Sequence, residues 1–94
     1  MLTIIARPTV DPAKIEEIKI AMLELVQATL KEEGCISYKL YQDNQEKNKF
    51  AFIEAWENHE LWRKHMEGEA IKEFNQKISG RIIDFELQQM DRVA

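Results

Sequence analysis

Four short stretches of the chain have the composition or the alternation of β-strands, and two longer stretches with helical spacing separate them. Residues 2–7 form a β-branched run that ends at Pro8, which cannot donate to a strand ladder. Residues 35–41, 50–56 and 81–90 alternate apolar and polar positions with a period of two. The pattern therefore predicts four strands.

The alternation also assigns faces to these strands. Residues 35–41 and the last strand each have one apolar face, whereas residues 50–56 carry apolar side chains on both faces and belong in the middle of a sheet. The faces in question hold Ile36, Tyr38 and Leu40; Ile83, Phe85 and Leu87; and, in the middle strand, Phe50, Phe52, Glu54 and Trp56 opposite Ala51, Ile53 and Ala55.

The first helical stretch begins after Asp11. An aspartate side chain can accept a hydrogen bond from an unpaired amide, and the fixed φ of Pro12 suits the first turn. Gly34 ends the helix because glycine adopts the left-handed cap conformation without steric cost. The buried face is predicted to contain Ile15, Ile18, Ala21, Met22, Leu25, Val26, Ala28 and Thr29.

The second helical stretch follows Asn58, which can cap it, and ends at Gly80. Gly68 interrupts the pattern, so the stretch is either one long helix or two short ones. Its inward stripe is predicted to contain Leu61, Trp62, His65, Met66, Ile71, Phe74 and Ile78.

The resulting order, β-α-β-β-α-β, predicts the split βαβ arrangement, an α+β fold in which both helices cover one face of a four-stranded antiparallel sheet. Residues 1–94 are expected to form one domain. Ala51, Ile53 and Ala55 would lie on the open sheet face. Since a monomer seldom leaves such an apolar patch in water, a homodimer packed sheet to sheet is predicted.

Composition excludes several classes of partner. The net charge is −4 and the basic residues are scattered among glutamates, so nucleic acid is not expected as a partner. No apolar run is long enough for a bilayer span, and the N-terminal segment lacks the features of a signal peptide. No membrane association is expected, and the cytoplasm is the expected compartment.

Candidate metal ligands are few. Cys35 is the single cysteine, and His59 and His65 are the two histidines. They do not form a spaced set of soft ligands, so no metal site is predicted. Cys35 has no cationic neighbour in sequence that would produce a thiolate, and it is interpreted as a small buried hydrophobe. His59 is expected to be exposed.

His65 is the candidate catalytic residue. It lies on the inward stripe, and an ordinary histidine pKa near 6.5 would let it accept a proton from a phenolic substrate. The alternative is a partly buried histidine that bonds a backbone carbonyl. A set of aromatic residues is predicted to line a substrate cleft, with core or dimer contacts as the alternative: Tyr38, Phe52, Trp56, Trp62 and Phe74.

Two further features have interpretations that are mainly structural. Glu54 shares a strand face with aromatic residues, and burial without a partner would raise its pKa. A salt bridge to Arg7 or Arg81 is the preferred interpretation. Asp43 and Asn44 are expected to build the turn between the middle strands rather than to bind a ligand.

Several motifs together support a family resemblance. They are Glu33-Gly34-Cys35, Tyr38, Leu40, Asp43-Asn44, Phe50, Glu54-x-Trp56, Leu61-Trp62, His65 and Phe74. In their order and spacing the chain resembles the antibiotic biosynthesis monooxygenase (ABM) domain family. The resemblance implies a dimeric, ferredoxin-like α/β barrel with a cleft in each subunit. It also implies one of several activities: cofactor-free oxidation of quinol or polyketide-like aromatics, haem degradation, or isomerisation of small metabolites.

The haem-degrading pattern of the family is not matched. That pattern has an asparagine near the end of the first strand, where this chain has Ala6-Arg7-Pro8. His65 stands where a tryptophan would be, and Asn75 stands near the position of the family's histidine. These departures argue against haem oxygenation.

The leading hypothesis is a monooxygenase that uses neither metal nor flavin and oxidises a quinol or polyketide-like aromatic with molecular oxygen. Such chemistry requires one base to produce an electron-rich anion and an apolar, water-poor pocket. The alternatives are a non-catalytic dimer that binds small molecules, a haem-degrading enzyme, and an isomerase.

Overall fold

The strands and helices follow the predicted order in the computed structural model, which describes residues 1–94. The predicted split βαβ, ferredoxin-like α+β fold is confirmed. In chain order the elements are β1 (Leu2–Val10), the 3₁₀ turn η1 (Pro12–Lys14), α1 (Ile15–Thr29), β2 (Cys35–Gln42), β3 (Phe50–Trp56), α2 (His59–Met66), α3 (Glu69–Lys77) and β4 (Ile82–Asp91).

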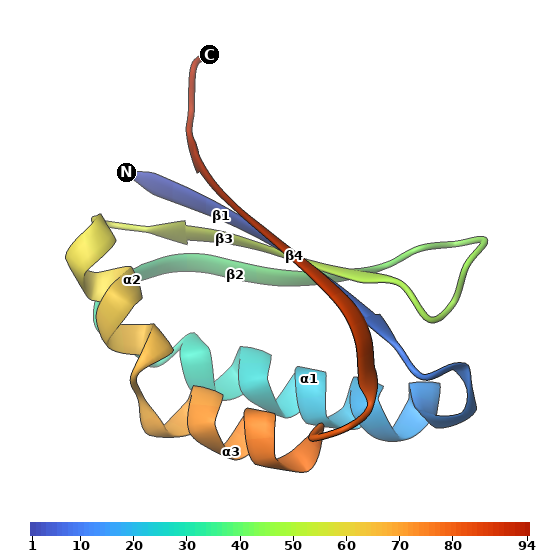
Figure 1. The fold of residues 1–94 in the computed structure, drawn as a ribbon. Helices are drawn as coiled ribbons and strands as arrows, with labels where there is room; N and C mark the ends of the chain where they lie inside the picture. The colour runs from blue at the N-terminus through green and yellow to red at the C-terminus, as the bar shows by residue number, and fades with distance from the viewer.

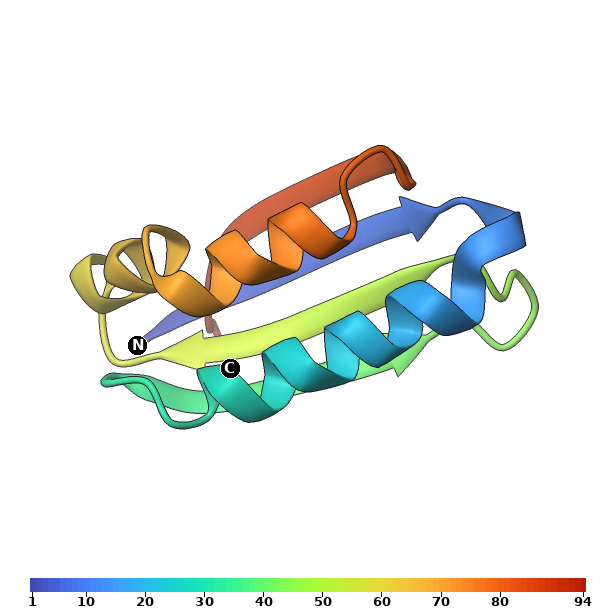
Figure 2. The same cartoon turned by 90° about the horizontal axis from the view of Figure 1, so that it is seen from below.

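The four strands form one antiparallel sheet in the order β2-β3-β1-β4. All the helices lie on one face of this sheet, and no helix covers the other (Figure 1). Helices α1 and α3 run side by side across the covered face, α1 under β2 and β3 and α3 towards β1 and β4 (Figure 2). The layer between sheet and helices is therefore formed by both halves of the chain.

The core lies between the helices and the covered sheet face. The alternation of β3 is confirmed, since Phe50, Phe52, Glu54 and Trp56 are all buried there. The predicted face of α1 is also confirmed, apart from Ala28, which is exposed at its margin. The largest side chains with almost no exposed surface are Ile4, Val10, Ile18, Met22, Thr29 and Trp56.

Strand β1 is longer than predicted and continues through Pro8 to Val10. Pro8 pairs with Phe85 of β4, whereas the continuous ladder with β3 ends at Ala6. At Pro8 the strand is thus bordered mainly by β4, the edge-like situation in which proline is tolerated.

Local signals at the helix starts agree with the structure, whereas the predicted helix stop at Gly34 is wrong. Helix α1 ends at Thr29, and Gly34 instead takes its positive φ of 84° in the turn directly before β2. Oδ1 of Asp11 accepts a hydrogen bond from the amide of Ala13 at 2.9 Å, although the first turn is 3₁₀. Oδ1 of Asn58 accepts from the amide of Leu61 at 2.9 Å and caps α2. The second helical stretch is two helices, and the amide of Gly68 donates to the carbonyl of His65 at 3.0 Å where α2 ends.

Two irregularities in the sheet change the predicted faces of β2 and β4. The register of β2 against β3 shifts between Cys35 and Ser37, and Ile36 is 53% exposed instead of sharing the buried face of Tyr38. A corresponding shift in the ladder between β1 and β4 leaves Ile83 exposed. An extra residue in one strand reverses the facing of its neighbours, which strict alternation does not anticipate.

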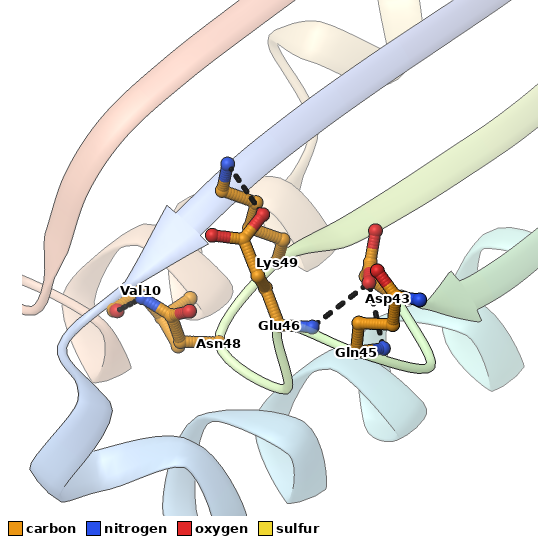
Figure 3. A network of polar contacts seen from close by, with 6 residues as sticks. All are labelled: Val10, Asp43, Gln45, Glu46, Asn48 and Lys49. Atoms are coloured by element: carbon orange, nitrogen blue, oxygen red, sulfur yellow. Dashed lines mark hydrogen bonds and ion pairs between the residues drawn. The ribbon is translucent and has the colours of Figure 1, made fainter.

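The loop between β2 and β3 is ordered by its own polar contacts (Figure 3). Oδ1 of Asp43 accepts hydrogen bonds from the amides of Gln45 and Glu46 at 2.8 and 2.9 Å, and these bonds lower the pKa of Asp43. Nδ2 of Asn48 donates to the carbonyl of Val10 at 3.0 Å and ties the loop to β1. The predicted turn-building role of Asp43 is confirmed.

The uncovered sheet face carries the predicted residues. Ala51 and Ala55 are partly exposed and Ile53 is 39% exposed. No helix has the length and apolar character needed to cross a bilayer.

Candidate functional site

A cavity of about 350 Å³ lies between the covered sheet face and the helices. Its size is within the range of small-molecule sites. Eleven of its fifteen lining residues are hydrophobic, and the polar side chains at it include Glu54, His65 and Asn75. The lining residues are Ala6, Pro8, Leu25, Tyr38, Phe52, Glu54, His65, Met66, Ile71, Phe74, Asn75, Ile78, Ile82, Phe85 and Leu87.

His65 lies on helix α2 and lines this cavity. The side chain of His65 is 1% exposed, and its Nδ1 lies 2.6 Å from Oε1 of Glu32. Since a carboxylate can only accept, Nδ1 carries the proton in the neutral ring and Nε2 is the unprotonated nitrogen. Nε2 has no hydrogen-bond partner within the chain. The backbone-carbonyl partner considered for this histidine is thus replaced by a carboxylate.

Burial and charge act in opposite directions on His65. Burial lowers the pKa of His65, and the hydrogen bond and negative charge of Glu32 partly offset that effect. The neutral ring therefore predominates at neutral pH, which is the form that can accept a proton.

Glu54 is buried at the same cavity, and the predicted salt bridge to Arg7 or Arg81 is wrong. Oε1 of Glu54 accepts a hydrogen bond from Nε1 of Trp56 at 3.0 Å. Arg81 pairs with Glu17 at 3.1 Å, and Arg7 bonds Gln88. Arg7 is exposed, whereas its neighbour Ala6 in β1 is buried and lines the cavity, so alternation directs the two side chains to opposite sides of the sheet.

The environment of Glu54 has a marked effect on its ionisation. Burial raises the pKa of Glu54 to about 7, and the hydrogen bond from Trp56 opposes this shift. Near neutral pH the carboxyl group thus exchanges between an acceptor-only form and a form that can also donate.

Three of the five predicted wall aromatics lie at the cavity. The rings of Tyr38 and Phe52 are 5.5 Å apart, and those of Phe52 and Phe74 are 6.3 Å apart and nearly perpendicular. Burial, followed by the charge of Glu54, raises the pKa of Tyr38, so its hydroxyl remains a donor at neutral pH.

The two tryptophans do not line the cavity, in contrast to the prediction. Trp56 has no exposed surface and lies behind the cavity, stacked on His65 with ring centroids 4.8 Å apart. Trp62 lies on α2 and is buried away from the cavity, with its ring centroid 5.4 Å from that of the exposed His59. The periods of the strand and the helix correctly predict that both side chains point inward. They do not predict whether an inward side chain lines the cavity or packs in the core.

Cys35 does not join this set of groups. Burial, together with the charges of Glu54 and Glu32, raises the pKa of the Cys35 thiol to about 11. It is therefore a thiol at neutral pH and a poor nucleophile.

Sequence reasoning missed several members of the site. Glu32 has no signal in the sequence beyond its position just before Gly34. Phe85 and Leu87 line the cavity only because β4 pairs with β1. Glu54 does have a signal in the sequence, since a carboxylate among aromatic residues is unusual, but its partner is Trp56 and not an arginine.

The arrangement supports acid–base chemistry in an apolar setting. A neutral histidine with one free nitrogen, a carboxyl group with a pKa of about 7 and a protonated phenol meet around one cavity. Together they can accept a proton from a weakly acidic hydroxyl group and hydrogen-bond the resulting oxygen.

This fold and site define an α+β domain with a largely apolar cleft. The family model for antibiotic biosynthesis monooxygenase (ABM) matches residues 1–77, and the chain belongs to this family. The resemblance inferred from the sequence is thereby confirmed.

Solved structures and a curated relative agree with this assignment. A crystal structure of an antibiotic biosynthesis monooxygenase has a TM-score of 0.94 and 28% identity and covers 100% of both chains. PA3566 from Pseudomonas aeruginosa has a TM-score of 0.93 and 28% identity, with 99% of this chain and 94% of that chain covered. These relationships support a monooxygenase-like function in general terms.

The curated relative is an uncharacterized protein, sll1783, from Synechocystis sp. It is 35% identical over 68 residues, which are 72% of this chain and 46% of the relative. The chain spans about half the length of that protein.

Proposed function

We propose that the protein is a cofactor-independent monooxygenase that oxidises a quinol or polyketide-like aromatic with molecular oxygen. The observation that carries the proposal is the state of His65, whose Nδ1 donates to Glu32, whose Nε2 has no partner within the chain, and whose ring lines an apolar cavity. A base of this kind in a water-poor site is what the reaction requires from the protein.

The proposed reaction begins with proton transfer from a substrate hydroxyl, or from an acidified ring carbon, to Nε2 of His65. The electron-rich anion then passes an electron to oxygen, and the two radicals combine at a ring carbon. One oxygen atom stays on the substrate and the other leaves as water, so a hydroquinone and O₂ give a hydroxyquinone and water. The substrate supplies all four electrons, and no external reductant enters the balance.

The walls suit a flat aromatic substrate. Phe52, Phe74 and Tyr38 provide ring faces and edges, against which aromatic groups pack at centroid distances of about 4.5–7 Å. Glu54 and Asn75 add polar contacts for substrate oxygens. Trp56 supports the site from behind by holding Glu54 and stacking on His65.

Oxygen uptake on a panel of quinols and anthrones tests this function. The wild-type protein is compared with H65A and with H59A, which removes the exposed histidine at the start of the same helix. We expect H65A to lose turnover by about 100-fold or more, as for loss of a general base, and H59A to retain it. Failure of the wild-type protein on every substrate, or full activity in H65A, would overturn the proposal.

A non-catalytic binding protein is the second candidate, because the same cavity admits an aromatic ring without turnover. Native mass spectrometry of the protein with naphthols and quinols separates the two. Stoichiometric binding without oxygen uptake supports the second candidate.

A further inference from the structure

His65 lies between the apolar cavity and a second hollow at the protein surface. This outer pocket has a volume of about 200 Å³ and is lined by six residues. His65 is the one residue that borders both spaces. The lining residues of the outer pocket are Glu32, Glu33, Leu61, Lys64, His65 and Gly68.

Glu32 is the partner of His65 on the outer side. The side chain of Glu32 is 26% exposed and that of His65 is 1% exposed, so the bond of 2.6 Å joins a buried ring to a carboxylate in contact with water. The backbone of Glu32 is held in the turn after α1, because its amide donates to the carbonyl of Thr29 at 2.9 Å. The carboxylate thus approaches the ring from a defined position.

We propose that Glu32 is a positioning residue for His65 and the route by which the proton taken from substrate leaves the cavity. Its carboxylate holds the proton on Nδ1, which leaves Nε2 as the acceptor. After Nε2 has taken a proton, the proton on Nδ1 passes to Glu32 and from there to water in the outer pocket. The ring is then neutral with its proton on Nε2, and reorientation or exchange with water restores the starting form. This inference rests on the proposed function only in that His65 acts as the base.

Other ionisable groups around His65 do not provide an equivalent contact. Burial and Glu32 account for the shifted pKa of His65, and Glu32 alone hydrogen-bonds the ring. The charged or titratable groups of the elements packed around it are Glu32 and Glu33 after α1, Cys35 and Tyr38 of β2, Glu54 of β3 and Lys64 of α2.

The variant E32Q removes the charge with little change of shape. Because the charge of Glu32 raises the pKa of His65, its removal lowers that pKa further, and a less basic ring accepts protons less readily. The neutral amide can also donate to Nδ1, which would move the ring proton to Nε2. E33Q is the matched control, since Glu33 lies in the same outer pocket and pairs with Lys64 at 3.3 Å without touching His65.

Nitrogen-15 NMR of the histidine rings in the full chain gives a readout that does not depend on activity. The wild-type protein and E33Q are expected to have a protonated Nδ1, an unprotonated Nε2 and the same His65 pKa. E32Q is expected to lose this tautomer preference and to titrate at lower pH. E32D keeps a charge near the ring and should titrate closer to wild type than E32Q does. An E32Q spectrum that matches wild type in tautomer and pKa would overturn the inference.

A second experiment measures the pH profile of kcat/KM for oxygen uptake in the same variants. We expect a loss of roughly tenfold or more in E32Q, with its acid limb moved to lower pH, and no change in E33Q. A changed NMR spectrum with an unchanged pH profile would overturn the role of Glu32 in proton transfer. If no substrate is oxidised, the proposed function fails, and the NMR result still decides whether Glu32 positions His65.

Discussion

The indole ring of Trp56 stacks on the imidazole of His65, with centroids 4.8 Å apart and planes inclined by 31°. The same indole donates its N–H to Glu54 at 3.0 Å. One residue with no exposed surface therefore contacts both His65 and Glu54, although it does not border the cavity itself. This relationship gives the strand-end tryptophan a structural role in a polar site.

Replacing Trp56 with phenylalanine is expected to destabilise the protein. W56F removes the donor to a buried carboxyl group, which costs about 1–3 kcal/mol beyond the loss of packing. W62F is the matched control, because Nε1 of the buried Trp62 has no hydrogen-bond partner to lose. Urea denaturation of both variants measures the difference, and equal losses would contradict the importance of the hydrogen bond.

Stability should depend on pH through Glu54. Its pKa rises from an ordinary value of 4.5 to about 7 on folding, so the folded state binds more protons than the unfolded state between these values. The contribution of Glu54 to stability therefore falls as pH rises from about 4.5 to 7. E54Q lacks this titration, and relative to wild type it should gain up to about 3 kcal/mol between pH 4.5 and 8.

Denaturation of the E54Q variant at several pH values checks this expectation. E57Q is the control, because Glu57 is exposed and lies just beyond the end of β3. A constant difference in free energy of unfolding between E54Q and wild type across this range would show that Glu54 is not a buried, proton-binding group.

The acid limb of the pH–rate profile should report His65. Burial lowers the pKa of His65 below its ordinary value of 6.5, so the neutral base persists to lower pH than in a free imidazole. We expect kcat/KM to fall only below pH 6.5. Because the folded pKa is the lower one, the stability associated with neutral His65 is present above 6.5 and is lost as pH falls from 6.5 through the lower folded pKa. A kinetic midpoint at or above 6.5 would contradict the assignment.

Alanine at position 34 should be far more damaging than alanine at position 80. Both glycines have positive φ, 84° and 78°, which costs an alanine about 1–2 kcal/mol. A Cβ on Gly34 would also overlap Cδ1 of Leu61 and lie 2.7 Å from its Cβ, whereas nothing lies within 4 Å of a Cβ on Gly80. Thermal denaturation of G34A and G80A should separate these two effects, and similar losses would exclude the steric one.

We predict that the protein forms a homodimer through its uncovered sheet face. I53E places a charge at the centre of that face, between Ala51 and Ala55, where Ile53 is 39% exposed. I20E is the control, since Ile20 is 59% exposed on helix α1, on the other side of the molecule (Figure 1). Analytical ultracentrifugation should find a dimer for wild type and I20E and a monomer for I53E; a dimeric I53E would exclude this interface.

The sequence alone determines the element order and most of the inward faces. Asp11 and Asn58 act through hydrogen bonds within a few residues, and Gly34 and Gly80 adopt positive φ, so these effects can be inferred from the local sequence. The face of β3 likewise follows from strict alternation. The β-bulges near Cys35 and Ile83 depend on how two strands register, and alternation within one strand carries no information about them.

The partners within the site are decided only by tertiary structure. Glu32 and His65 are 33 residues apart, and their contact requires α2 to pack beside the turn that follows α1. The neighbours of Glu54 in the sequence show that it is unusual, but its hydrogen-bond partner is Trp56 and not the expected arginine. Glu54 and Trp56 both lie on the covered side of the sheet. The period of a strand or helix determines which side chains point inward, whereas the packing of elements distant in sequence determines which of them meet and what space remains between them.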